Sequence, residues 1–205
     1  MEKIKADVHV LGDLCDIAWL LNIRGGDIPC VPVVLSFLCV TKEDCIWYVR
    51  EQIMTEEIRQ YLKERGVLVR DYEAVYKDLS GLAAGRKVLL DKKNVNYRLL
   101  TAVSGQADVI DRRSPAELMK AVKNDTEIRN LRTAHLKEGI AFTRLMYWLK
   151  TGAGKEALTE RSVAEYLDAR RREQEHYVGQ SFAPISAYGA NGAIVHYSPT
   201  EESDA

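Results

Sequence analysis

The sequence CDIAWLLNIRGGDIPCVPVVLSFLCV, residues 15–40, decides how the first half of this chain folds. Residues 15–22 have the apolar spacing of a short helix, and residues 31–40 form a β-rich run that predicts a strand. Between them, residues 24–29 combine two glycines with a proline that cannot donate to a strand ladder, so we expect a loop. A helix, a loop and a strand in this order favour a mixed α/β domain.

Strand and helix patterns continue on both sides of this stretch. Val8 and Val10 alternate with polar residues and predict a strand within residues 6–14. Residues 45–49 are a second β-rich run, and the polar residues 41–44 predict a hairpin of two antiparallel strands. The pattern also predicts helices over residues 55–65, 72–82 and 97–103, and strands over residues 67–69 and 87–90. We therefore expect a first domain over residues 1–112.

The second half, residues 113–205, opens on helix signals. Ser114 suits an N-cap, Pro115 the first helical position and Glu117 a capping box, so a helix is expected through residue 123. A long helix with an apolar stripe follows to about residue 150, and residues 151–154, TGAG, are expected to end it. Thr159 is expected to cap a third helix that ends near residue 172. Residues 181–199, SFAPISAYGANGAIVHYSP, predict a strand, a glycine-containing turn and a strand that ends at His196.

Composition excludes several classes of partner. The chain has 29 basic and 30 acidic residues, a net charge of −1, which gives no field to attract nucleic acid or an anionic membrane. No signal peptide and no apolar run of the ~20 residues needed for a membrane span are present in the sequence. The four cysteines lack CxxC spacing and are expected to be buried free thiols, which agrees with a cytoplasmic location.

The four histidines are the first candidates for chemistry. They lie far apart in the sequence without an HExxH motif, so the sequence predicts no metal site within the chain. We expect His9 to face solvent or a sheet edge, His135 to be a structural or half-exposed residue of the long helix, and His176 to be solvated. His196 is different, because an apolar strand that follows a turn can aim an imidazole into a cleft as a hydrogen-bond donor or proton carrier. The alternative is a strand-end histidine at the surface.

Arg24 is the second candidate. The motif RGGD at residues 24–27 has neither a GxGxxG fingerprint nor a Walker lysine, which argues against phosphate binding. It is either an ordinary tight turn with an Arg24–Asp27 pair, or it holds Arg24 at the mouth of a cleft. The sequence does not support nucleophilic catalysis, because it contains no GxSxG motif and no cysteine in an electropositive setting.

Two long motifs resemble those of one family. Residues 16–40 resemble the opening of the middle, creatinase-like domain of the long, three-domain Xaa-Pro aminopeptidases, which has the form D-I-A-W-L-x-N-x-R-G-x-D-I. Residues 121–150, AVKNDTEIRNLRTAHLKEGIAFTRLMYWLK, are similar to the first helices of that family's pita-bread catalytic domain, and residues 181–199 to its substrate-proximal strand and turn. The resemblance implies an α/β fold with a creatinase-like mixed sheet, followed by the opening helices and first strands of a pita-bread domain.

The resemblance also implies an activity. Members of the family release the N-terminal residue of peptides with proline in second place, using two divalent ions, commonly manganese, held by two Asp, one His and two Glu. We expect these ligands beyond Ala205 and a further small domain ahead of Met1, so the chain alone is expected to be an inactive fragment without metal. His196 is similar to the histidine that contacts substrate, and Arg24 lies in the motif that faces the cleft in relatives. Proline-containing peptides are the implied substrates, and a homodimer is the implied assembly.

Two alternatives stay open. A non-catalytic module of the pita-bread fold could grip a peptide or protein without metals, and the sequence encoded after Ala205 would distinguish the two. An Asp-Ser-Gly or Asp-Ala-Gly there, with a second Asp about eleven residues on, would indicate the enzyme. Prolidase or creatinase shares the fold, but the N-x-R-G-x-D-I signature resembles the aminopeptidases.

Overall fold

The computed structural model describes residues 1–152 and 158–205. Its residues form two compact units, which are described separately. The first unit contains Met1–Ile28 and Pro32–Val122, and the second contains Pro29–Val31 and Lys123–Ala205.

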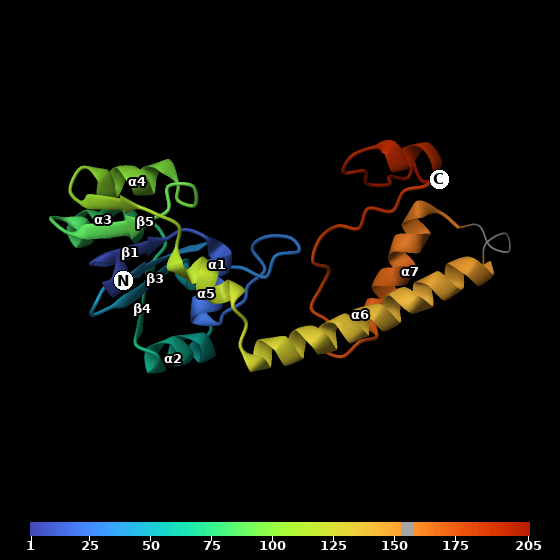
Figure 1. Ribbon diagram of the computed structural model, residues 1–205, viewed down its shortest axis with the longest axis horizontal. Helices are drawn as coiled ribbons and strands as arrows, with labels where there is room; N and C mark the ends of the chain where they lie inside the picture. Colours follow the sequence, from blue (N-terminus) through green and yellow to red (C-terminus); the bar gives the residue numbers. More distant parts are fainter. Residues whose placement is uncertain (153–157) are drawn as a thin grey trace. The chain divides into compact units, whose positions relative to one another are not determined.

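The first unit is built on a six-stranded mixed sheet with the order β4-β3-β2-β1-β5-β6 (Figure 1). The strands are β1 (Val8–Leu11), β2 (Ser36–Val40), β3 (Cys45–Val49), β4 (Val67–Asp71), β5 (Lys87–Leu90) and β6 (Asp108–Asp111). β2 pairs antiparallel with β1 and β3, whereas β1–β5, β5–β6 and β3–β4 are parallel pairs. The predicted mixed α/β class and the predicted hairpin are confirmed.

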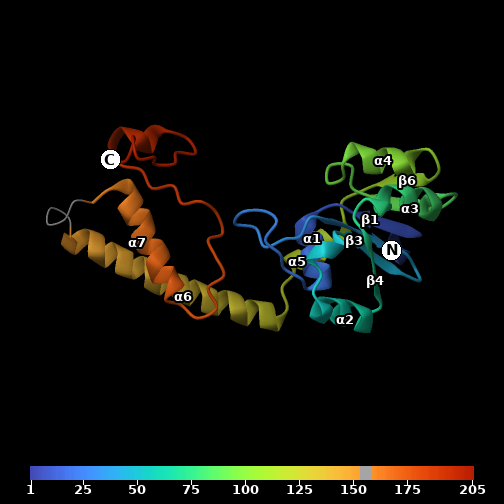
Figure 2. The ribbon, with the colours of Figure 1, turned by 180° about the vertical axis from the view of Figure 1, so that it is seen from behind.

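Helices cover both faces of this sheet (Figures 1 and 2). The helices of this unit are α1 (Leu14–Leu21), α2 (Glu56–Glu64), α3 (Ala74–Ala83), α4 (Tyr97–Ser104) and α5 (Pro115–Ala121), with short 3-10 turns at Glu2–Ile4 and Glu51–Ile53. One apolar cluster joins α3 and α4 to the sheet, and a second joins α1, α2 and α5 to it. All four residues of β1 are buried as a result.

Two strands differ from the prediction. β2 begins at Ser36 rather than at residue 31, because the Leu35 amide donates to Asp27 Oδ2 at 2.8 Å and Pro32 has no amide hydrogen to give a ladder. β6 was not predicted, because a four-residue edge strand that begins and ends with aspartate has a weak strand signal.

The helix starts follow their capping residues. Ser114 and Thr159 accept hydrogen bonds from backbone amides of the first turn, as predicted, and Asp13, Thr55 and Asn96 do the same for α1, α2 and α4. A side-chain oxygen at this position satisfies one of the amides that a helix start leaves without a partner.

The second unit contains two paired helices, α6 (Asp125–Gly152) and α7 (Glu160–Arg172). Trp148 and Tyr166 stack across the pair with ring centroids 4.2 Å apart, and Arg171 donates to the Glu138 carboxylate. The helix α6 includes Thr151 and Gly152, which were expected to end it. The other two residues of that predicted helix end, 153–154, lie outside the described residues.

The strands predicted within residues 181–199 are wrong. This stretch is extended or bent, with one 3-10 turn at Gly189–Ala193, and it pairs with no strand among the described residues. Ile194 has extended backbone angles, yet a strand requires a hydrogen-bonded neighbour in addition to those angles. Among the residues that the structure describes, no helix has the length and apolarity to cross a bilayer.

Candidate functional site

The loop that carries Arg24 is held by its neighbours in the motif. A Cβ on Gly25 would lie 2.3 Å from Val34 Cγ2, so only glycine allows the backbone this close to the next segment. Asp27 closes the loop, because its amide donates to Val33 O at 3.2 Å and its carboxylate accepts from Leu35 N. The Arg24–Asp27 pair, one of the two alternatives for this motif, does not form among the described residues, and the Arg24 side chain is exposed.

Asp16, in the same motif, is a buried carboxylate that sequence reasoning missed. Its side chain is only 3% exposed and pairs with Lys120 Nζ at 2.7 Å, which joins α1 to α5. Burial lowers the pKa of Lys120, but the hydrogen bond from its ammonium to Asp16, together with the negative charges of Asp16 and Asp13, outweighs this and the pKa is raised. The signal in the sequence was a lone Asp among the apolar residues of a helix.

His9 is the clearest correction among the histidines. It lies on β1, between β2 and β5, and is buried, not solvent-facing or at an edge. Burial lowers its pKa to about 4, because the imidazolium loses hydration in the interior. The alternation with Val8 and Val10 was misleading because helices cover both faces of the sheet.

The remaining histidines and the cysteines are placed as follows. His135 and His176 are exposed, so His176 is solvated as expected.

All four cysteines are free, and Cys39 is buried with a pKa raised to about 12 by burial, as expected for an inert thiol. Cys45 is half-buried, but Cys15 and Cys30 are exposed, so the expectation of four buried thiols is wrong for these two.

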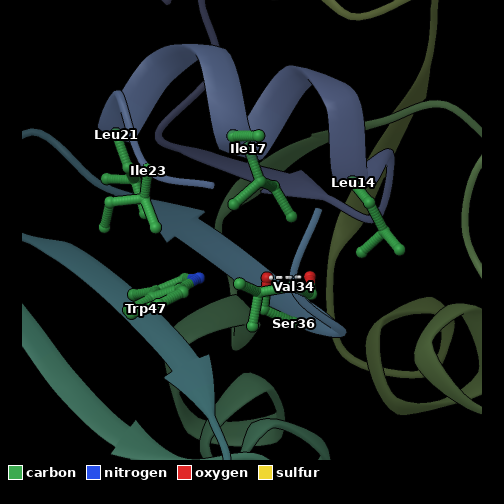
Figure 3. A pocket seen from close by; sticks show the side chains of 8 residues that line it. Leu14, Ile17, Leu21, Ile23, Val34, Ser36 and Trp47 are labelled. Carbon is green, nitrogen blue, oxygen red and sulfur yellow. Dashed lines mark hydrogen bonds between the residues drawn. The ribbon is translucent and has the colours of Figure 1, made fainter. Parts of the chain in front are cut away.

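Two cavities of the first unit lie beside its sheet. A space of about 10 Å³ lies between α1 and the sheet, with Leu14, Ile17 and Trp47 in its mostly apolar lining (Figure 3). It has room for one water molecule at most. A cleft of about 600 Å³ lies beside the carboxyl ends of β1, β5 and β6, but its charges are balanced and largely paired. The pairs include Lys92–Asp111 at 3.5 Å and Arg113–Glu117 at 2.8 Å.

His196 lies in the second unit on an exposed loop with a buried anchor. Its φ of 57° is left-handed, and the next residue, Tyr197, is buried. The Tyr197 hydroxyl donates to Glu160 Oε2 at 2.6 Å, and Glu160, the first residue of α7, is itself 3% exposed. Sequence reasoning also missed Glu160. His196 thus projects outward from a turn whose following residue is fixed in the interior.

The described residues do not supply the metal site that the resemblance implies. Across residues 1–152 and 158–205, no group of three or more His, Cys, Asp or Glu side chains is placed to hold a metal ion. His196, in particular, belongs to no such group in the described part of the chain. A pair of divalent ions therefore does not fit the residues present here.

Two family models match the chain. Residues 1–127 match the creatinase/prolidase N-terminal domain, and residues 129–204 match metallopeptidase family M24. A probable Xaa-Pro aminopeptidase P of Sordaria macrospora is 37% identical over 97% of this chain and 34% of its own length. Xaa-Pro aminopeptidase 1 of Dictyostelium discoideum is 34% identical over 100% of this chain and 33% of its own length. The chain therefore spans about a third of the length of the curated relatives it matches.

Solved structures agree with these matches. A crystal structure of X-prolyl aminopeptidase from Caenorhabditis elegans, described as a cytosolic enzyme with a di-nuclear active site, matches 98% of this chain and 34% of its own. The TM-score is 0.93 and the identity 31%. Aminopeptidase P of Escherichia coli, 14% identical with a TM-score of 0.57, shares the fold. Through residues 1–127 the chain belongs to the family of creatinase/prolidase N-terminal domains, here followed by a segment that matches metallopeptidase family M24.

Proposed function

We propose that this chain forms the creatinase-like domain and the first part of the catalytic domain of a metal-dependent Xaa-Pro aminopeptidase. The observation that carries the proposal is the similarity to X-prolyl aminopeptidase over 98% of the chain with a TM-score of 0.93. Its substrates would be peptides with proline in second place. A cytoplasmic location is proposed with it, because the Caenorhabditis elegans relative is described as cytosolic.

His196 is the residue proposed to act on substrate. It is exposed, and its left-handed backbone turns the chain so that Tyr197 enters the interior while the imidazole stays outside. An imidazole N–H presented in this way can donate a hydrogen bond to the oxygen that becomes negative when a peptide carbonyl is attacked. Arg24, exposed on a loop closed by Asp27, is proposed as a second substrate contact.

The metal ions are proposed for the complete protein only. Two divalent ions, with manganese as the first choice, would supply an activated water in a metallopeptidase of this kind. The described residues do not form a ligand set, so we propose that the chain by itself binds no ion pair and turns over no peptide. A homodimer is proposed as the assembly of the complete enzyme.

A chimera tests the proposal. The part of the Caenorhabditis elegans enzyme that aligns with this chain, 34% of that protein, would be replaced by residues 1–205. The chimera is expected to cleave Xaa-Pro-Xaa peptides when manganese is added, and the isolated chain is expected to show no turnover. His196→Ala in the chimera is expected to lower kcat about 10²-fold or more, the usual loss when a donor to a developing oxyanion is removed.

His176→Ala is the matched control, because His176 is also exposed and left-handed and lies in the same unit. It is expected to leave kcat within about twofold. A well-folded chimera without peptidase activity would refute the proposal and favour the non-catalytic peptide-binding module. Equal losses in the two histidine variants would refute the role of His196.

A further inference from the structure

Glu160 accepts an unusual number of hydrogen bonds for one buried side chain. Its two carboxylate oxygens receive the Tyr197 hydroxyl at 2.6 Å, the Tyr188 amide at 2.5 Å and Asn191 Nδ2 at 3.1 and 3.3 Å. The amide of Ala205 lies 3.5 Å from Oε2. All these donors come from the segment that follows α7, so one carboxylate gathers groups 28 to 45 residues away in the sequence.

The donors flank the His196 loop on both sides. Tyr188 and Asn191 precede residues 192–196, and Tyr197 follows them directly. Between these anchors the loop contributes little packing of its own, because Val195 is 84% exposed and Ile194 and His196 are exposed as well. One backbone hydrogen bond, from the Ile194 amide to Asn191 O at 3.0 Å, fixes the start of the loop. The side-chain hydrogen bonds that hold the loop come from its two ends, and both ends are bound to Glu160.

Further hydrogen bonds tie the two ends to each other. Asn191 Nδ2 lies 3.0 Å from the Tyr197 hydroxyl oxygen and donates to Ser203 O at 3.0 Å. Ser203 Oγ lies 3.0 Å from the same hydroxyl, and Asp204 Oδ1 accepts from the Arg161 amide at 2.9 Å. These hydrogen bonds connect the segment after α7 to the first turn of that helix, and they hold the Glu160 side chain in place.

A carboxylate suits this position better than an amide does. The groups that surround Glu160 are hydroxyl and N–H donors, and an ionised carboxylate is an acceptor with about four lone-pair sites. Burial raises the pKa of Glu160, but the hydrogen bonds from Tyr197, the Tyr188 amide and Asn191 outweigh it, and the pKa is lowered. The residue therefore stays ionised at neutral pH, which keeps all its acceptor sites available.

We propose that Glu160 is a positioning residue that holds both ends of the 192–196 loop and thereby sets the direction of His196. The inference rests on the proposed function, because it gives Glu160 a role in the reaction only through His196. Glu160 itself touches no substrate in this account. Its contribution is to present the imidazole in one orientation before substrate arrives, so that little ordering is needed in the transition state.

The first test measures the loop in the chain itself. Backbone NMR order parameters for residues 192–196 are expected near about 0.85 in the unmodified chain, and below about 0.6 in Glu160→Gln and in Tyr197→Phe. Tyr197→Phe removes only the hydroxyl, and Glu160→Gln retains one acceptor oxygen, so both variants keep a side chain of similar size at these positions. Glu165→Gln is the matched control, because Glu165 is an exposed residue of the same helix. It is expected to leave the order parameters unchanged.

The second test uses the chimera. Glu160→Gln is expected to lower kcat about tenfold with KM nearly unchanged. The reason is that a less ordered His196 would weaken its hydrogen bond to the oxygen that becomes negative in the transition state. Unchanged order parameters in both Glu160→Gln and Tyr197→Phe would overturn the positioning role, whatever the activity. An inactive unmodified chimera would count against the proposed function instead, and the order parameters would still decide whether Glu160 holds the loop.

Discussion

Among the residues that the structure describes, two carboxylates are buried, and each is satisfied in a different way. Asp16 pairs with the Lys120 ammonium at 2.7 Å, whereas Glu160 accepts hydrogen bonds from several uncharged donors. An ion pair of the first kind neutralises a buried charge with one partner, so the loss of that partner is costly. The second kind distributes its charge over several donors.

Removal of the Lys120 ammonium is expected to be strongly destabilising. Lys120→Ala leaves the buried Asp16 carboxylate without its counter-charge, and a broken buried pair costs about 3–5 kcal/mol of unfolding free energy. Lys92→Ala is the control, because the Lys92–Asp111 pair is about half exposed and is expected to contribute at most ~1 kcal/mol. Urea denaturation of both variants measures the difference, and equal midpoints would contradict the buried role of Asp16.

His9 is expected to make the stability of the first unit depend on pH. The folded state keeps His9 neutral down to about pH 4, whereas the unfolded chain takes up a proton below about pH 6.5. The unfolded state then binds more protons, so the unfolding free energy falls as the pH drops from about 6.5 to 4, by roughly 3 kcal/mol in total. Denaturation of the unmodified chain and of His9→Leu across this range measures it. The same slope in both proteins would show that His9 is not responsible.

At the scale of elements, the loop after α1 depends on close backbone approach. Gly25 lies against Val34, and a Cβ there would also meet Val33 O at 3.0 Å. A Cβ on the adjacent Gly26 would meet no atom of the described residues within 4 Å, so the two glycines of one motif have different structural roles. Only the first is required by packing.

Gly25→Ala is therefore expected to destabilise the first unit by about 1–3 kcal/mol, the usual range for overpacking, because the clash involves backbone as well as a side chain. Gly26→Ala is the matched control and is expected to change the unfolding free energy by less than about 0.5 kcal/mol. Thermal or urea unfolding of the pair decides between them. A neutral Gly25→Ala would mean that the loop moves away from Val34 without penalty.

At the scale of the whole molecule, α6 leaves apolar side chains in solvent. Leu136, Ile140 and Tyr147 share one side of the helix at i, i+4 and i+11 spacing, and all three are exposed. Apolar residues grouped in this way on an exposed face favour association with another apolar surface.

The chain is therefore expected to self-associate as its concentration rises. Sedimentation velocity should show a concentration-dependent mass, and Leu136→Glu combined with Ile140→Glu should restore the monomer. Tyr97→Glu is the control, because Tyr97 is a comparably exposed apolar residue at the first position of α4 in the other unit. A monomer at high concentration in the unmodified chain would contradict the prediction.

The local elements of the chain were predictable because their signals are local. The hairpin turn follows from Thr41, whose hydroxyl accepts the amides of Glu43 and Asp44, and α7 begins where Thr159 caps it. Each of these bonds joins residues no more than three apart, so a short stretch of sequence contains both partners. The motif that resembles the family, residues 16–40, is likewise one continuous stretch of sequence.

The sequence by itself determined the helix starts, the hairpin, the mixed α/β class and the family, and it singled out His196 and Arg24 as candidates. Only the tertiary structure decided that His9 is buried, that residues 181–199 form no strand, and that Asp16 and Glu160 are the charged anchors of their units. The physical reason is distance along the chain. Burial and strand pairing depend on partners that are distant in the sequence, as Asp16 depends on Lys120 and Glu160 on Tyr197. A local sequence pattern does not contain the identity of such a partner.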